Sequence, residues 1–93
     1  QPNMIQRALH VRHELELIKA LPNPRNLLPL HYAVRSLWAL TVQQPQQCAK
    51  LPDCADLLHE LARTMPRYSY LAHSDNIQRR AKQLINLTLR AAA

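Results

Sequence analysis

Aromatic and basic residues gather in one stretch of this chain, where two tyrosines stand beside two arginines. Tyr68 and Tyr70 are flanked by Arg63 and Arg67. Aromatic and arginine side chains are the ones that most often carry the binding energy of protein interfaces. The spacing therefore predicts a rim that docks a peptide. The alternative is that either ring folds back over the core and leaves only its hydroxyl in water.

A second basic cluster lies near the C-terminal end, where Arg79, Arg80 and Lys82 fall within four residues. Such a cluster could contact the phosphates of DNA, although a charged run on an outer helix face is more often simply solvated. Recognition of bases would need base-reaching side chains or stacking rings beside the charge, and none accompany this cluster. Any DNA contact is therefore predicted to be weak and electrostatic.

The remaining chemistry-bearing residues predict neither a metal site nor an enzyme. The five histidines are scattered, and Cys54 and His59 do not share a helix face, whereas a structural zinc site needs four compactly spaced ligands. The two cysteines, Cys48 and Cys54, are expected to be reduced and mostly buried thiols. The chain has no glycine, which nearly excludes a phosphate-binding glycine loop, and it carries no catalytic motif. We expect no cofactor.

Seven prolines and the absence of glycine divide the chain into segments that each predict a helix. Glycine supplies the positive φ of tight turns and hairpins, so a compact β-fold is disfavoured. Apolar residues recur at spacings of three and four, as at Val11, Leu15 and Ile18. The predicted helices cover about residues 4–21, 27–42, 45–50, 53–65 and 75–91. The residues expected to cap them are Asn26, Asp53 and either Ser74 or Asp75.

The connectors between these segments predict how the helices pack. Pro22 and Pro24 end the first helix, and its short link to the second favours an antiparallel hairpin. Pro66 ends the fourth helix, and a loop over residues 67–73 leads into the fifth, which is expected to pair with the fourth in the same way. The chain of 93 residues is expected to form one domain, residues 1–93. The predicted fold is all-α, a compact right-handed bundle of five helices, one of them short, built as two antiparallel hairpins.

The charge of the chain narrows the class of partner. Twelve Lys and Arg against six Asp and Glu give a net charge of +6 and a pI near 10.0. Charge of this size favours acidic partners, either nucleic acid or an acidic peptide. No apolar run approaches the ~18 residues of a membrane span, so no membrane contact is expected. The first and last residues suggest a domain cut from a longer protein.

The order of parts in the second half resembles a known family. The stretch SLWALTVQQPQQCAKLPDCADLLHEL (residues 36–61) is followed, after a loop, by NIQRRAKQLINLTLRA (residues 76–91). This order is similar to the helical N-terminal domain of transcription elongation factor TFIIS and of its relatives in Elongin A and a Mediator subunit. Within that superfamily it most resembles the integrase-binding domain of lens epithelium-derived growth factor and of hepatoma-derived growth factor-related proteins. The matching stretches are IQR (5–7), LTVQQPQQ (40–47) and LHEL (58–61).

The resemblance implies a nuclear protein-interaction domain, monomeric, that tethers transcription-elongation or chromatin factors. Its partners would be short acidic and hydrophobic motifs of disordered nuclear proteins, often with a Phe-x-x-Phe core. In that family the two interhelical loops form the partner site. That site corresponds here to Ala20, Leu21, Pro22, Asn23, Arg63, Met65, Arg67, Tyr68 and Tyr70. The first loop lacks the acidic residue with which the family holds its partner's backbone, and the second loop is several residues longer.

Two other functions stay open. One is non-specific binding of nucleic acid through the basic last helix. The other is a fragment of an armadillo- or HEAT-like repeat scaffold, because AVRSLWALT (33–41) and RRAKQLINLT (79–88) recur about 46 residues apart, within the range of such repeats.

Overall fold

The computed structural model describes residues 3–93, and the chain is helical over most of that range. Its α-helices are α1 (Met4–Ala20), α2 (Leu28–Gln43), α3 (Pro45–Ala49), α4 (Cys54–Thr64) and α5 (Ser74–Ala92). A short 3₁₀ helix, η1 (Met65–Tyr68), lies between α4 and α5. No strand occurs within the described range. The prediction of an all-α bundle with five α-helices, one of them short, is confirmed.

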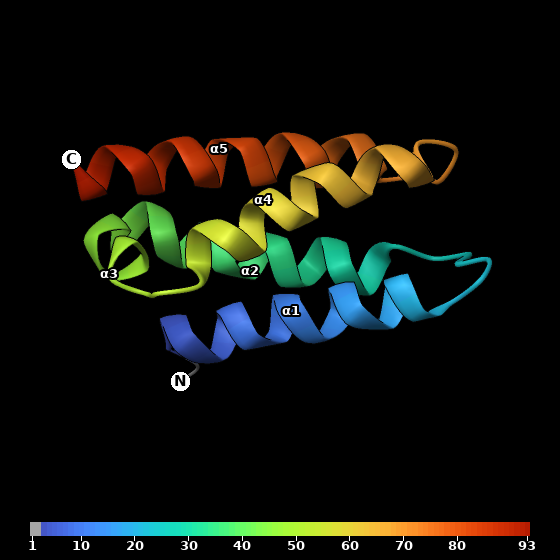
Figure 1. Cartoon of the computed structure of the whole chain (residues 1–93), viewed down its shortest axis with the longest axis horizontal. Coiled ribbons are helices and arrows are strands. Elements are labelled where there is room, and N and C mark those ends of the chain that lie inside the picture. Colours follow the sequence, from blue (N-terminus) through green and yellow to red (C-terminus); the bar gives the residue numbers. More distant parts are fainter. Residues whose placement is uncertain (1–2) are drawn as a thin grey trace.

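The helices form two antiparallel hairpins, α1 with α2 and α4 with α5 (Figure 1). Helices α2 and α5 run in the same direction and pack against each other, so they make the centre of the bundle. Helix α3 packs on α5 at the end opposite the two long interhelical connections. Helix α1 packs chiefly on α2 and touches α4 only lightly. It is therefore the most peripheral of the long helices.

The core is aliphatic, as a chain without phenylalanine requires. Its centre is made of fully buried leucines from all the long helices: Leu15, Leu30, Leu37, Leu58, Leu61 and Leu84. Each such side chain contributes ~1.5–3 kcal/mol when it leaves water. The single tryptophan, Trp38, is only partly buried and packs at the edge of this core. The bundle thus depends on helix-on-helix packing of branched side chains.

Polar side chains close the starts of α1 and α2. The Asn3 side chain accepts a hydrogen bond from the Gln6 backbone N–H, and the Gln6 side chain accepts one from the Asn3 N–H, each at 2.9 Å. This reciprocal pair satisfies two N–H groups that the helix leaves free. The cap residue of α2 is Leu27, which makes no side-chain capping bond; the predicted cap, Asn26, lies one residue earlier, and its side chain accepts a hydrogen bond from the Leu28 N–H at 2.9 Å. Asp53 directly precedes α4, but its side chain makes no capping bond.

The start of α5 differs from the prediction. Neither Ser74 nor Asp75 caps the helix, because Ser74 is already its first residue and is buried. The capping residue is His73, whose φ of 75° lies in the left-handed region. Among the described residues no other has a positive φ. Left-handed backbone costs a residue other than glycine about 1 kcal/mol. The contact of its ring with His31, at 5.3 Å between centroids, helps to hold His73 in place.

The connection between α4 and α5 is more ordered than the predicted loop. Helix α4 ends at Thr64, close to where Pro66 was expected to end it. The chain then turns through η1 before it reaches α5. Proline fits the first turn of a helix because the N–H it lacks would be unpaired there. Pro66 therefore stops the α-helical bonding of α4 and at the same time starts the 3₁₀ helix.

Candidate functional site

The two interhelical loops that were predicted to form a partner site lie at the same end of the bundle (Figure 1). One connects α1 to α2, and the other runs through η1 to the start of α5. Their common position follows from the two antiparallel hairpins, since each hairpin turns at that end. We call residues 20–23 together with residues 63–70 the loop rim.

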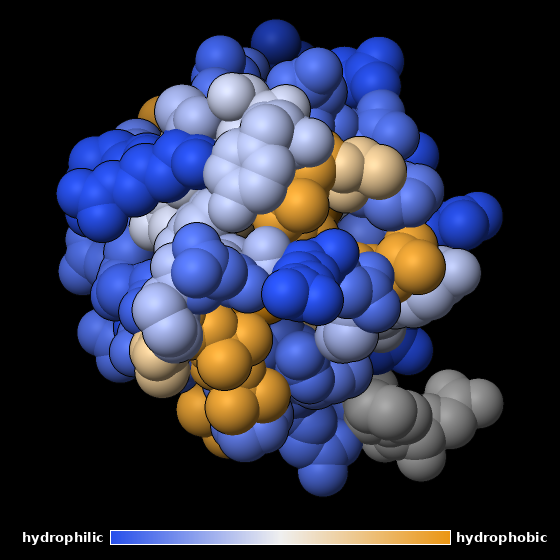
Figure 2. Space-filling view, turned by 90° about the vertical axis from the view of Figure 1, so that its right-hand side faces the viewer, coloured by the Kyte–Doolittle hydropathy of each residue, from blue (hydrophilic) through white to orange (hydrophobic). Residues whose placement is uncertain are grey.

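Apolar side chains of the loop rim are exposed to solvent. Leu21 is 52% exposed and Tyr70 is 69% exposed, whereas Tyr68 is partly buried and packs against the core. The neighbouring Ala20, Pro22 and Asn23 are also exposed. Figure 2 looks onto this end and shows apolar surface in separate patches divided by polar side chains. The loop rim therefore offers separate anchor points and not one continuous apolar face.

The arginines of the loop rim have no counter-charge. Arg63 and Arg67 are both exposed, and neither forms an ion pair with any residue of the described range 3–93. Arg63 belongs to the last turn of α4, and Arg67 belongs to η1. Both guanidinium groups are therefore free to meet an acidic partner.

Met65 does not belong to the accessible part of the loop rim. The residue is fully buried and is a member of the core, because it opens η1 directly under the end of α4. The prediction that Met65 contacts a partner is corrected accordingly. Its side chain supports the loop rim from beneath.

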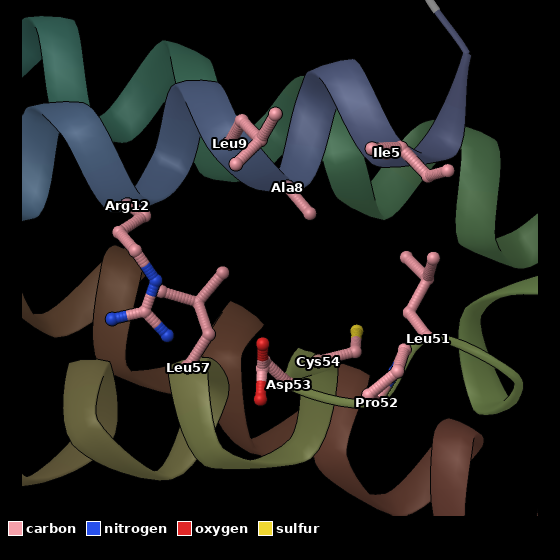
Figure 3. A pocket seen from close by; sticks show the side chains of 9 residues that line it. All are labelled: Ile5, Ala8, Leu9, Arg12, Leu51, Pro52, Asp53, Cys54 and Leu57. Atoms are coloured by element: carbon pink, nitrogen blue, oxygen red, sulfur yellow. The ribbon is translucent and has the colours of Figure 1, made fainter.

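A groove that was not predicted from the sequence runs between α1 and the start of α4 (Figure 3). Its volume is about 220 Å³. Most of the side chains that line it are apolar, and Arg12 and Asp53 are its charged members. Helix α1 contributes Ile5, Ala8 and Leu9, and the chain from the α3–α4 turn into α4 contributes Leu51, Pro52, Cys54 and Leu57. We call this surface the α1–α4 groove.

A signal for the α1–α4 groove was present in the sequence. Ile5 and Leu9 lie one helical turn apart, outside the stripe of α1 that fills the core, and they are 54% and 61% exposed. Apolar residues on the outer face of an amphipathic helix indicate a contact surface more strongly than residues on its buried stripe.

Charged side chains join α1 to α4 beside this groove. The Arg12 Nη1 atom lies 3.4 Å from Glu60 Oε2, and Lys19 Nζ contacts the other carboxylate oxygen of Glu60. The hydrogen bond from Lys19, with the positive charge of Arg12, lowers the pKa of the Glu60 carboxyl. The same hydrogen bond raises the pKa of Lys19. Glu60 therefore stays ionised and ties the two helices together.

The predicted nucleic-acid cluster extends over two neighbouring hollows of the surface. Arg79 and Arg80 line a polar hollow of about 440 Å³ between α2 and α5, together with His31 and Arg35 of α2 and with Asn76 and Gln83. We call it the basic hollow. Lys82 lines a neighbouring hollow with Asp75 and Asn86, and Arg79 lines both hollows. The third basic side chain beside Arg79 and Arg80 in this hollow is therefore Arg35 and not Lys82. No local pattern in the sequence connects Arg35 with residues 79 and 80.

The basic hollow concentrates positive charge. Burial lowers the pKa of His31, and the nearby His73, Arg35 and Arg80 lower it further. The Arg80 guanidinium carbon lies 5.3 Å from the centre of the Trp38 ring, a distance at which cation and ring attract each other. No carboxylate of residues 3–93 lines the hollow.

Residues 3–93 contain neither a metal-binding cluster nor a membrane-spanning helix. No three His, Cys, Asp or Glu side chains of that range come close enough together to hold a metal ion. No helix of the described chain is long and apolar enough to cross a membrane. No protein-family model matches the chain, and comparisons with curated proteins and with solved structures found no match.

Proposed function

We propose that this bundle is a protein-interaction domain that binds short acidic and hydrophobic segments of disordered partners at the loop rim. One observation carries the proposal. Two exposed apolar side chains, Leu21 and Tyr70, occur at the same end of the bundle as two arginines without counter-charge, Arg63 and Arg67. The core uses neither apolar side chain, so a partner could bury both without repacking the bundle.

The chemistry of the partner follows from this arrangement. Separate apolar anchor points suit a short segment with one or two large apolar side chains, such as phenylalanine, better than a flat domain surface. The net charge of +6 and the two free arginines favour acidic residues on either side of those anchors. The arginines would mainly speed association, whereas the apolar contacts would set how long the complex lasts. The resemblance to the TFIIS N-terminal and integrase-binding domains extends the proposal to a nuclear, monomeric domain that tethers transcription or chromatin factors.

An NMR titration tests the site directly. An acidic peptide with a Phe-x-x-Phe core should shift the amide signals of residues 20–23 and 63–70 and leave the far end of the bundle unchanged. Tyr70→Ala and Leu21→Asp should each weaken the peptide by at least ~1–2 kcal/mol. Val42→Ala is a matched control, because Val42 is also exposed but belongs to the last turns of α2, away from the loop rim. Shifts confined to α5 would refute the proposal.

The basic hollow favours a second candidate function, electrostatic binding of nucleic acid. Arg35, Arg79 and Arg80 could neutralise backbone phosphates there. Arg80 covers one face of the Trp38 ring and the ring packs against the core, so it is not free to stack on a base. A DNA duplex should therefore bind weakly, without sequence preference, and its affinity should fall steeply as salt rises. Binding that survives high salt, or that prefers one sequence, would promote this function above the first.

A further inference from the structure

The two cysteines of the chain meet inside the bundle. Cys48 belongs to α3, Cys54 is the first residue of α4, and their Sγ atoms lie 2.8 Å apart. Both thiols are free and almost completely buried, at 0% and 2% exposure. A disulfide bond is about 2.05 Å long, so the two sulfurs need to approach by under ~1 Å. The residues that join α3 to α4 form a short run of turns and not regular helix.

The surroundings of the pair favour the thiolate that oxidation requires. The Cys54 thiol hydrogen-bonds to Cys48, and the Thr88 hydroxyl lies 3.5 Å from Cys48 Sγ. These hydrogen bonds lower the pKa of Cys48 even though burial opposes the change. The same bond and burial raise the pKa of Cys54. The pair therefore loses one of its two protons more readily than a lone buried thiol would. The two sulfurs then share the proton that remains.

The α1–α4 groove gives one of the two sulfurs a path to solvent. Cys54 is among the residues that line this groove, and Cys48 is not. In Figure 3 the Cys54 sulfur points into the space between α1 and the α3–α4 turn. A hollow of about 220 Å³ can hold a small oxidant beside it. Only Cys54 can be reached from the groove, so Cys54 reacts first, once the proton that it shares with Cys48 has moved to Cys48.

We propose that Cys48 and Cys54 are a redox site that closes to an intramolecular disulfide when a peroxide enters the α1–α4 groove. The shared proton moves to Cys48 as the Cys54 sulfur attacks one oxygen of hydrogen peroxide, which breaks the O–O bond and releases hydroxide. Cys54 is thereby oxidised to the sulfenic acid. The Cys48 sulfur then attacks the Cys54 sulfur and displaces the second hydroxide, which takes the Cys48 proton to form water. Two thiols have been oxidised and one peroxide reduced.

The bond would change one wall of the α1–α4 groove. The segment closed by the disulfide contains Leu51, Pro52 and Asp53, all of which line the groove. Oxidation would therefore fix these residues to the end of α3 and restrict how far the groove can open. This site is independent of the loop rim, which lies at the other end of α4.

Intact mass spectrometry of the folded chain tests the proposal. After mild hydrogen peroxide treatment, the mass of the chain should fall by two hydrogens. Neither cysteine should then react with an alkylating reagent under denaturing conditions, and a non-reducing gel should show no dimer. Dithiothreitol should restore both thiols. Cys48→Ser should stop at the Cys54 sulfenic acid, which dimedone captures. Cys54→Ser should leave Cys48 at least ~10-fold less reactive, because oxidation needs access as well as thiolate character, and Cys48 is fully buried and does not line the groove.

Two results would overturn the proposal. One is oxidation of the native chain to sulfinic acid or to dimers without an internal bridge. The other is dimedone capture at Cys48 as fast as at Cys54. If a serine variant fails to fold, as circular dichroism would reveal, the order of reaction is read in the native chain instead. There dimedone, added together with peroxide, should mark Cys54 before the bridge closes.

Discussion

Substitutions at two residues of the loop rim, Met65 and Tyr70, should show which position supports the fold and which binds a partner. Met65 is fully buried in the core, whereas Tyr70, five residues further on, is 69% exposed. Met65→Ala should therefore destabilise the bundle and Tyr70→Ala should not, although both positions belong to the same predicted interface. Only Tyr70→Ala should act on a partner directly.

The expected magnitudes follow from the burial of each side chain. Truncating a buried methionine to alanine costs ~2–5 kcal/mol, because the transfer energy is lost and a cavity remains. A domain of this length has a total stability of about 5–14 kcal/mol, so Met65→Ala should remove a large part of it. Each kcal/mol corresponds to a shift of ~4–8 °C in the melting temperature of a small domain, which predicts a decrease of at least ~8 °C. Tyr70→Ala should change the stability by less than ~0.5 kcal/mol.

Urea unfolding measures both variants with two independent signals, far-ultraviolet circular dichroism and the fluorescence of Trp38, the only tryptophan. The dependence of free energy on urea should stay the same in both variants, because the surface exposed on unfolding hardly changes. A Tyr70→Ala variant destabilised by more than ~1 kcal/mol would show that the ring packs against the bundle. A Met65→Ala variant as stable as the parent would show that the support assigned to η1 is wrong.

Three further predictions concern charged and titrating groups. Arg80→Met keeps an unbranched stem over Trp38 but removes the charge, so it should cost about 0.5–1 kcal/mol of cation–π energy and change the fluorescence spectrum of Trp38. The folded pKa of His31 is below its ordinary value of 6.5, so the unfolded chain binds more protons just below pH 6.5. The free energy of unfolding should therefore fall as the pH drops from about 6.5 towards the folded pKa, and His31→Gln should flatten this slope. Glu60→Gln should lower the melting temperature slightly at low salt and not at high salt, because its ion pairs are partly exposed and screened.

The course of the helices could be predicted from the sequence because prolines and apolar spacing act locally. Pro22, Pro45 and Pro66 each stop a helix through their own backbone geometry, and the spacing of Val11, Leu15 and Ile18 defines a face within a single helix. These signals need no knowledge of the rest of the fold. The pairing of the hairpins follows from connector length for the same reason.

The candidate sites were less predictable because they depend on tertiary packing. Arg35 joins Arg79 and Arg80 only because α2 lies against α5. Met65 lies in the core because a 3₁₀ helix follows α4, and the pattern of one loop does not reveal this. His73 takes the left-handed position with its ring against His31 of α2, whereas propensity alone favours Ser74 or Asp75 as the cap. In each case the deciding contact joins residues that no local rule connects.

The peripheral position of α1 has a consequence for the motions of the bundle. Helix α1 packs mainly on α2 and is tied to α4 only lightly, through side chains such as Glu60, while α2 and α5 hold the centre together. Opening of α1 away from α4 would break far fewer contacts than unfolding the whole domain, and such partial openings need less free energy than global unfolding. Amide hydrogens of α1 are therefore expected to exchange earlier than those of α2 and α5, because α1 can unfold locally at a lower free energy. The groove between α1 and α4 can accordingly widen and narrow while the rest of the bundle stays folded.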